Sequence, residues 1–132
     1  MHVQTLDLQG VTPGHRHSLN VLRFGTPGAR PRATIQAALH ADEVPGLLVA
    51  QALRQQLLAL EAAGQLLGEV QLVPYANPIG LAQHVNGQHQ GRFDARDGVN
   101  FNRNHPDLAQ AACAALQGRL GDDAQANVLA VR

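Results

Sequence analysis

The pattern of apolar and polar positions predicts three short strands in the first half of the chain. Residues 18–25 (SLNVLRFG) and 69–75 (EVQLVPY) are short apolar segments followed by turn residues, which is typical of strands. Residues 33–39 (ATIQAAL) are nearly all small or apolar and lie between a Pro/Gly turn and an acidic turn. A segment of this kind predicts a strand buried on both faces of a sheet.

A helix is predicted over residues 45–63, between the second and third of these strands. Pro45 is tolerated in a first helical turn, and Gly64 is suited to a helix C-terminus. The order strand, helix, strand indicates a βαβ unit, with a parallel strand pair and a right-handed crossover. The apolar positions recur at the spacing of one helix face and comprise Leu47, Ala50, Leu53, Leu57 and Leu60.

The second half of the chain has a different pattern. Residues 82–104 are rich in Gly, Asn, Gln, His, Asp and Arg, and a long polar loop of this kind is usually functional or disordered. Residues 106–120 and 123–131 have helical character, and no last strand follows them. We therefore expect residues 1–132 to form a single α/β domain with a mostly parallel or mixed sheet flanked by helices. We expect this domain to be the incomplete, N-terminal portion of a larger one.

Composition narrows the possible function classes. Hydrophobic residues are 45% of the chain and charged residues 15%, which permits a packed core. All ten basic residues are Arg, and ten acidic residues balance them. The chain therefore lacks the net positive charge expected of a nucleic-acid binder. The absence of Lys excludes a lysine Schiff base and a P-loop. Because no apolar stretch has the length of a membrane span or signal peptide, we expect a soluble, cytoplasmic protein.

Single nucleophilic residues and scattered histidines offer weaker candidates. Cys113 is the only cysteine, which excludes an internal disulfide. We expect it to be buried as a small residue of an Ala-rich helix. Ser18 lacks the G-x-S-x-G surroundings of a serine hydrolase. Histidines in the polar loop could add metal ligands, although solvated histidines are the commoner case; these are His84, His89 and His105.

The segment HADE, residues 40–43, is the first candidate for chemistry. If His40 ends the buried strand and Glu43 opens the helix, both side chains leave the carboxyl edge of the sheet, where α/β folds bind ligands. An imidazole and a carboxylate three residues apart can reach one zinc ion. The spacing alone more often reflects a polar strand end followed by a favourable first-turn charge, so both interpretations stay open.

The polar loop holds the second candidate, a group of arginines and an asparagine in GRFDARDGVNFNRNHPD, residues 91–107. Arginine grips a carboxylate with a planar fork of donors, and an adjacent Asn adds another donor, so the group suits a small anionic substrate. Alternatively, nearby aspartates pair with these arginines on a solvated surface. The four candidates are Arg92, Arg96, Asn102 and Arg103.

Taken together, these segments resemble the zinc carboxypeptidase superfamily and, within it, the succinylglutamate desuccinylase/aspartoacylase branch. The family has an H-x-x-E at a strand end, an Asn-Pro after the following strand, and an arginine loop ending in Asn-Arg. Here the order and spacing match as HADE (40–43), YANP (75–78) and the loop over residues 91–107. The resemblance covers about residues 33–107. It implies a zinc-dependent hydrolase acting on an amide bond.

The resemblance also implies roles for individual residues. His40 and Glu43 would be two of three ligands to Zn²⁺. Asn102 and Arg103 would hold the carboxylate of a small acyl-amino acid or peptide. Arg92 would match the catalytic arginine that stabilises the oxyanion.

Two questions about the site stay open. Arg96 is the second candidate for the oxyanion role, because the gap between this arginine and the Asn-Arg pair varies in the family. The family's third zinc ligand, a histidine after the next strand, and its catalytic glutamate would lie beyond Arg132. We therefore expect residues 1–132 to contain half of an active site and to lack catalytic activity alone. The alternative functions are a non-catalytic carboxylate-binding module without metal, or a structural fragment that needs a partner segment to complete its sheet.

Overall fold

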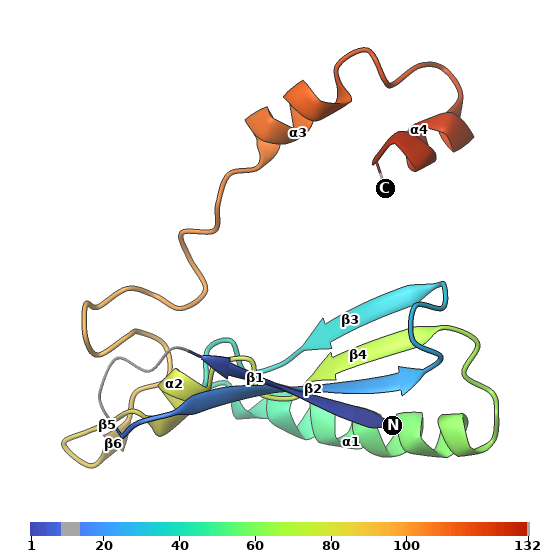
Figure 1. Ribbon diagram of the computed structural model, residues 1–132. Helices are drawn as coiled ribbons and strands as arrows, with labels where there is room; N and C mark the ends of the chain where they lie inside the picture. Colours follow the sequence, from blue (N-terminus) through green and yellow to red (C-terminus); the bar gives the residue numbers. More distant parts are fainter. Residues whose placement is uncertain (9–13, 132) are drawn as a thin grey trace.

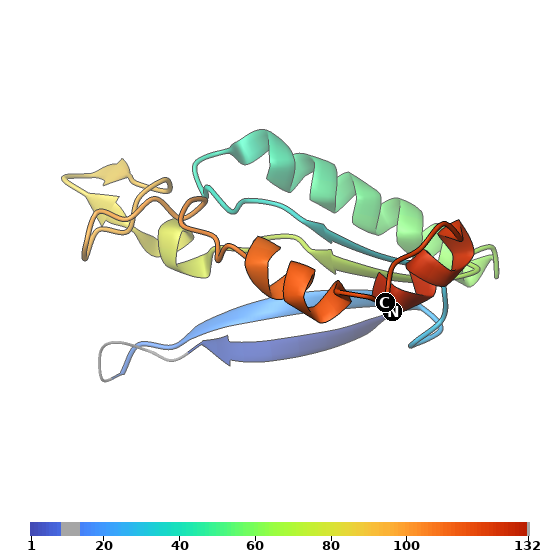
Figure 2. The same ribbon diagram turned by 90° about the horizontal axis from the view of Figure 1, so that it is seen from above.

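The computed structural model describes residues 1–8 and 14–131. It contains a four-stranded sheet with one long helix along one face (Figures 1 and 2). The strand order is β1-β2-β4-β3. The main elements are β1 (His2–Leu8), β2 (His17–Gly25), β3 (Arg32–Gln36), β4 (Glu69–Val73) and α1 (Val44–Ala62).

Strand pairing confirms the predicted βαβ unit. Strands β3 and β4 are parallel, and α1 connects them along the chain. The other two pairings, β1 with β2 and β2 with β4, are antiparallel. The fold is therefore α/β with a mixed sheet, as expected, and its antiparallel half comes from the N-terminal hairpin.

The hydrophobic core lies between the sheet and α1. Phe24 and Leu72 are fully buried on neighbouring strands, where β2 and β4 pair. Helix α1 places Ala50 and Leu57 against them, and both belong to the stripe predicted from the sequence. This packing holds α1 against β2 and β4, and it fixes the start of the helix beside the carboxyl end of β3.

Two expectations about the strands are wrong. The segment at residues 33–39 is not buried on both faces, because all five residues of β3 are exposed. Strand β3 lies at the edge of the sheet with β4 on one side, and α1 packs on β2 and β4 instead. In addition, β1 was not predicted, since its alternation is weak and most of its residues are exposed.

Short elements that the sequence did not indicate lie just before and within the polar loop. Helix α2 (Pro78–Ala82) follows β4, and β5 (His84–Val85) pairs with β6 (Gln88–His89) in a small hairpin. Further along, Phe93 and Asn100 form an isolated bridge that folds the arginine loop back on itself.

The two predicted C-terminal helices are present as α3 (Ala109–Leu116) and α4 (Ala124–Val131). Neither has a buried residue, and Figure 1 shows both apart from the sheet, after an extended segment. Cys113 is therefore exposed, and its expected burial is wrong. Within residues 1–8 and 14–131, none of the helices is both long enough and apolar enough to cross a membrane.

Candidate metal and carboxylate site

The chain turns sharply between β3 and α1, and this turn positions the candidate ligands. Ala37 continues the pairing with the neighbouring strand, because its N–H donates to the Val73 carbonyl (3.0 Å) and its carbonyl accepts from the Ala76 N–H (2.8 Å). Ala38 then has a left-handed backbone, with φ of 57°. Such a conformation is costly for a residue with a Cβ atom and is often found at functional sites. The next residues bring His40 to the carboxyl end of the sheet.

Backbone contacts fix the turn on both sides of His40. Asn77, from the Asn-Pro pair, is buried, and its Nδ2 donates to the Leu39 carbonyl (2.9 Å). On the other side, the Ala41 N–H donates to the Gly91 carbonyl (2.9 Å). Gly91 lies so close to the turn that a Cβ atom there would be 2.3 Å from the Asp42 nitrogen. The loop that carries Arg92 is thereby attached directly to the turn.

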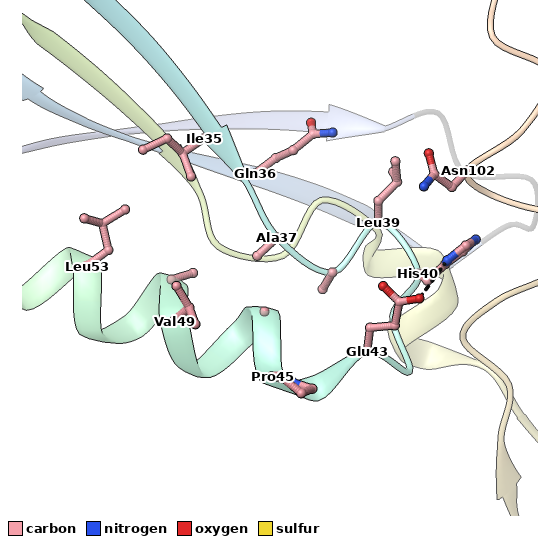
Figure 3. A pocket seen from close by; sticks show the side chains of 13 residues that line it. Ile35, Gln36, Ala37, Leu39, His40, Glu43, Pro45, Val49, Leu53 and Asn102 are labelled. Carbon is pink, nitrogen blue, oxygen red and sulfur yellow. Dashed lines mark hydrogen bonds and ion pairs between the residues drawn. The ribbon is translucent and has the colours of Figure 1, made fainter.

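The structure brings the two candidate metal ligands together (Figure 3). His40 is buried, and its Nδ1 lies 3.1 Å from Glu43 Oε1. Two groups that bind one zinc ion at its usual distances lie roughly 3–3.5 Å apart. The separation between these two atoms is therefore compatible with a shared ion.

Arg92 contacts both candidate ligands. Its Nη2 donates to Glu43 Oε1 (2.7 Å), its Nη1 lies 3.0 Å from His40 Nδ1, and its Nε lies 3.9 Å from Asp42 Oδ2. Since these side chains are about half exposed, the ion pairs contribute little to stability. Their geometry is more informative, because one cation binds the two atoms that would ligate a metal.

The same neighbours keep the carboxylate ionised. The His40 ring and, second to it, the Arg92 guanidinium hold the pKa of Glu43 below its ordinary value. A carboxyl group must be deprotonated to bind a metal ion, so this shift maintains Glu43 in the ligating form.

Arg96 has a different environment from Arg92. Its Nε donates to both carboxylate oxygens of the buried Asp94, at 2.9 and 3.1 Å, and this contact lowers the pKa of Asp94. The surface pairing that the sequence left open therefore applies to Arg96. Of the two arginines, Arg92 is the one placed beside His40 and Glu43.

A cavity of about 690 Å³ opens next to the ligand pair, between β3 and the first turns of α1. Figure 3 shows His40, Glu43 and Asn102 at one end of it and apolar side chains from both elements along its length. Asn102 thus lines the cavity at the end that holds the ligand pair. Arg103 is exposed, and its Nη1 donates to the Asn102 carbonyl (2.7 Å).

One residue at the site was missed by the sequence interpretation. Asn100 Oδ1 lies 2.7 Å from His40 Nε2, on the opposite side of the ring from Arg92. The sequence held no signal for it, because residues 101–102 form a turn and the contact joins residues sixty positions apart.

The described residues provide two metal-binding side chains at this point. Within residues 1–8 and 14–131, no three His, Cys, Asp or Glu side chains come close enough to hold one ion. Of the other candidate histidines, His84 and His89 face each other across the β5–β6 hairpin, and His105 Nε2 lies 3.2 Å from Asn102 Oδ1.

Comparison with known proteins gives a family match over most of the chain. Residues 29–127 match the profile of the succinylglutamate desuccinylase/aspartoacylase catalytic domain. No curated protein matches the chain.

Two solved structures are similar in both fold and sequence. A succinylglutamate desuccinylase/aspartoacylase family protein from Shewanella amazonensis SB2B superposes with a TM-score of 0.67 at 31% identity, over 93% of this chain and 33% of that one. A candidate succinylglutamate desuccinylase/aspartoacylase from Shewanella frigidimarina NCIMB 400 has a TM-score of 0.64 at 26% identity, over 92% and 32% of the two chains. The chain thus spans about a third of the length of these structures.

Proposed function

Because the chain belongs to the succinylglutamate desuccinylase/aspartoacylase family, a family of hydrolases, we propose that it is the N-terminal portion of a zinc-dependent amide hydrolase. The observation that supports this most is the convergence of His40 Nδ1 and Glu43 Oε1 on one cation, the Arg92 guanidinium. The substrate class we propose is an N-acyl amino acid or small peptide with a free carboxylate. Activity belongs to the longer catalytic domain, since the solved relatives are about three times as long as their matched part.

His40 and Glu43 would hold the zinc ion. The donor set supports this, because a neutral imidazole nitrogen and an ionised carboxylate are ordinary zinc ligands. Zinc held by these residues would supply Lewis-acid polarisation of the scissile carbonyl and a more acidic water molecule. A third ligand and a proton-transferring glutamate, which the resemblance implies, are proposed to come from outside residues 1–132.

The loop residues would bind and orient the substrate. Asn102 lies at the wall of the cavity next to the ligand pair, where its amide could donate to a carboxylate. Arg103 is its neighbour in the chain and would supply the charge. Arg92 has its donors beside the ligand pair and would face the carbonyl oxygen as that oxygen becomes negative. Neither nucleic acid nor membrane is a proposed partner, and a cytoplasmic location stays a prediction.

The metal assignment can be tested on the 132-residue chain by calorimetric titration with Zn²⁺. We expect one weak site, because two ligands leave most of the coordination shell to water. His40→Ala and Glu43→Gln should each abolish it. His15→Ala, which removes an exposed histidine, should leave it unchanged. Equal zinc binding by all four proteins would overturn the assignment.

The catalytic assignment needs the longer domain and steady-state kinetics. A carboxylate held by Asn102 and Arg103 is charged before and during the reaction, so Arg103→Ala should chiefly raise KM. The contact from Arg92 strengthens as charge develops, so Arg92→Ala should lower kcat by about 10²–10³. Arg96→Ala is the matched control and should preserve kcat. Loss of kcat in Arg96→Ala alone would transfer the oxyanion role to that residue.

A further inference from the structure

Asn100 has a fixed amide orientation. Its Oδ1 accepts a hydrogen bond from the Asn102 backbone N–H (2.9 Å), and a backbone N–H can only donate. The atom that faces the loop is therefore the oxygen. The same oxygen lies 2.7 Å from His40 Nε2. An oxygen of an amide can only accept, so His40 Nε2 must carry the hydrogen in this contact.

On the other side of the ring, Nδ1 has two neighbours of opposite kinds. Arg92 Nη1, 3.0 Å away, can only donate, whereas the ionised carboxylate oxygen Glu43 Oε1, 3.1 Å away, can only accept. These two contacts do not select the state of Nδ1, so the contact with Asn100 is the one that assigns a hydrogen to Nε2. In the neutral ring, that hydrogen leaves Nδ1 with the lone pair that a metal ion needs.

We propose that Asn100 is a positioning residue that holds His40 in the tautomer whose Nδ1 can bind a metal ion. The metal part of this inference rests on the proposed function; the tautomer part does not. His40 is buried, so its polar ring atoms need partners, and Asn100 supplies the one that is not used for ligation. Partners of this kind fix the orientation and tautomer of a ligating histidine.

Asn100 also couples the ligand to the substrate loop. Its single oxygen accepts from both His40 and the backbone of Asn102, which lies at the wall of the cavity. Displacing this oxygen should therefore disturb the ring and the loop together. An amide performs the task without a charge, whereas a carboxylate at the same position would make a stronger, charge-assisted bond and make His40 a more basic ligand.

The tautomer can be measured without metal. In the 132-residue chain labelled with ¹⁵N-histidine, imidazole nitrogen shifts at mildly alkaline pH should show His40 with its hydrogen on Nε2. His40→Gln identifies the signals. Asn100→Ala should give a mixture of tautomers, and Asn100→Asp, which keeps the acceptor and the side-chain size, should preserve the Nε2–H form. An unchanged His40 spectrum in Asn100→Ala, or a wild-type ring with its hydrogen on Nδ1, would overturn the proposal.

Zinc titration of the same variants tests the consequence for the ligand. Asn100→Ala should bind Zn²⁺ about 10–100-fold more weakly than the wild type, and Asn100→Asp more tightly. Asn104→Asp adds the same charge to an exposed position of the same loop and is the matched control. If it tightened binding as much as Asn100→Asp, general charge would explain the gain and the ligand role would fail. If no variant bound zinc while the tautomer still shifted in Asn100→Ala, the proposed function would fail and the positioning role would stand.

Discussion

Helices α1 and α3 are both largely apolar and have very different surroundings. Helix α1 has six Leu and four Ala among its 19 residues and buries Ala50 and Leu57 against the sheet, whereas α3 has five Ala, one Leu and no buried residue. Helix α4 resembles α3 in this respect. Helical propensity is sufficient to predict all three helices, but burial requires an opposing apolar surface. The candidate site lies at the start of α1 and therefore belongs to the half of the molecule that has a packed core.

The largest expected difference between the two regions is in how much an apolar side chain contributes to the free energy of unfolding. Phe24→Ala should lower the free energy of unfolding by about 3–5 kcal/mol, because it removes a fully buried ring and leaves a cavity beside Leu72 and α1. Leu129→Ala, in α4, should change it by less than about 0.5 kcal/mol, since this leucine is 72% exposed. Urea unfolding followed by circular dichroism measures both. Comparable losses would show that the C-terminal helices share the core.

A second contrast uses two glycines. Gly91→Ala should cost about 1–3 kcal/mol and displace the Arg92 loop, because the added Cβ would meet the backbone of Ala41 and Asp42. Gly121→Ala, between α3 and α4, is the control, since a Cβ there meets open space. Thermal unfolding gives the stability change, and zinc titration shows whether the site is lost. A neutral Gly91→Ala would mean that the loop is not attached to the turn as described.

The path from sequence to structure also differs between the two regions. The βαβ unit was predictable because its helix has a clear apolar periodicity and its two strands are short apolar segments bounded by turn residues. The burial of β3 was not, since whether a strand is central or at an edge depends on which strands lie beside it. Strand β1 was missed for a related reason: its exposed residues do not require a regular apolar pattern.

The candidate site shows the same limit. The H-x-x-E spacing and the arginine loop indicated His40, Glu43 and Arg92, and the structure brings these three together. Asn100 could not be selected from the other asparagines of the loop, because its contact with His40 spans sixty residues of sequence. The left-handed turn at Ala38 had no signal, because alanine rarely adopts this conformation.

A third, smaller effect concerns acid stability in the site loop. Arg96 holds the pKa of the buried Asp94 below its ordinary value of 3.8. A carboxylate with a lowered folded-state pKa contributes stability that is present above its unfolded value and lost as pH falls through the folded value. Asp94→Asn should therefore cost about 1 kcal/mol at pH 7 and progressively less below pH 3.8.

The measurement is urea unfolding of Asp94→Asn and wild type across this pH range. Asp122→Asn provides the counterpart in the exposed region and should cost less than about 0.5 kcal/mol at pH 7. A stability difference for Asp94→Asn that stayed constant down to low pH would show that the loss is steric rather than ionic.

The smallest expected effect lies within the C-terminal region itself. Asn127 holds the start of α4 to the preceding loop, because its Oδ1 accepts from the Gly121 N–H (2.9 Å) and its Nδ2 donates to the Gly121 carbonyl (2.7 Å). Asn127→Ala should weaken this local structure by about 0.5 kcal/mol, so amide hydrogen exchange at Gly121 should accelerate about twofold. Since α4 has no buried residue, the midpoint of global unfolding should not move. A lower midpoint would show that α4 unfolds together with the sheet, and the contrast between the two regions would then be one of exposure rather than of cooperativity.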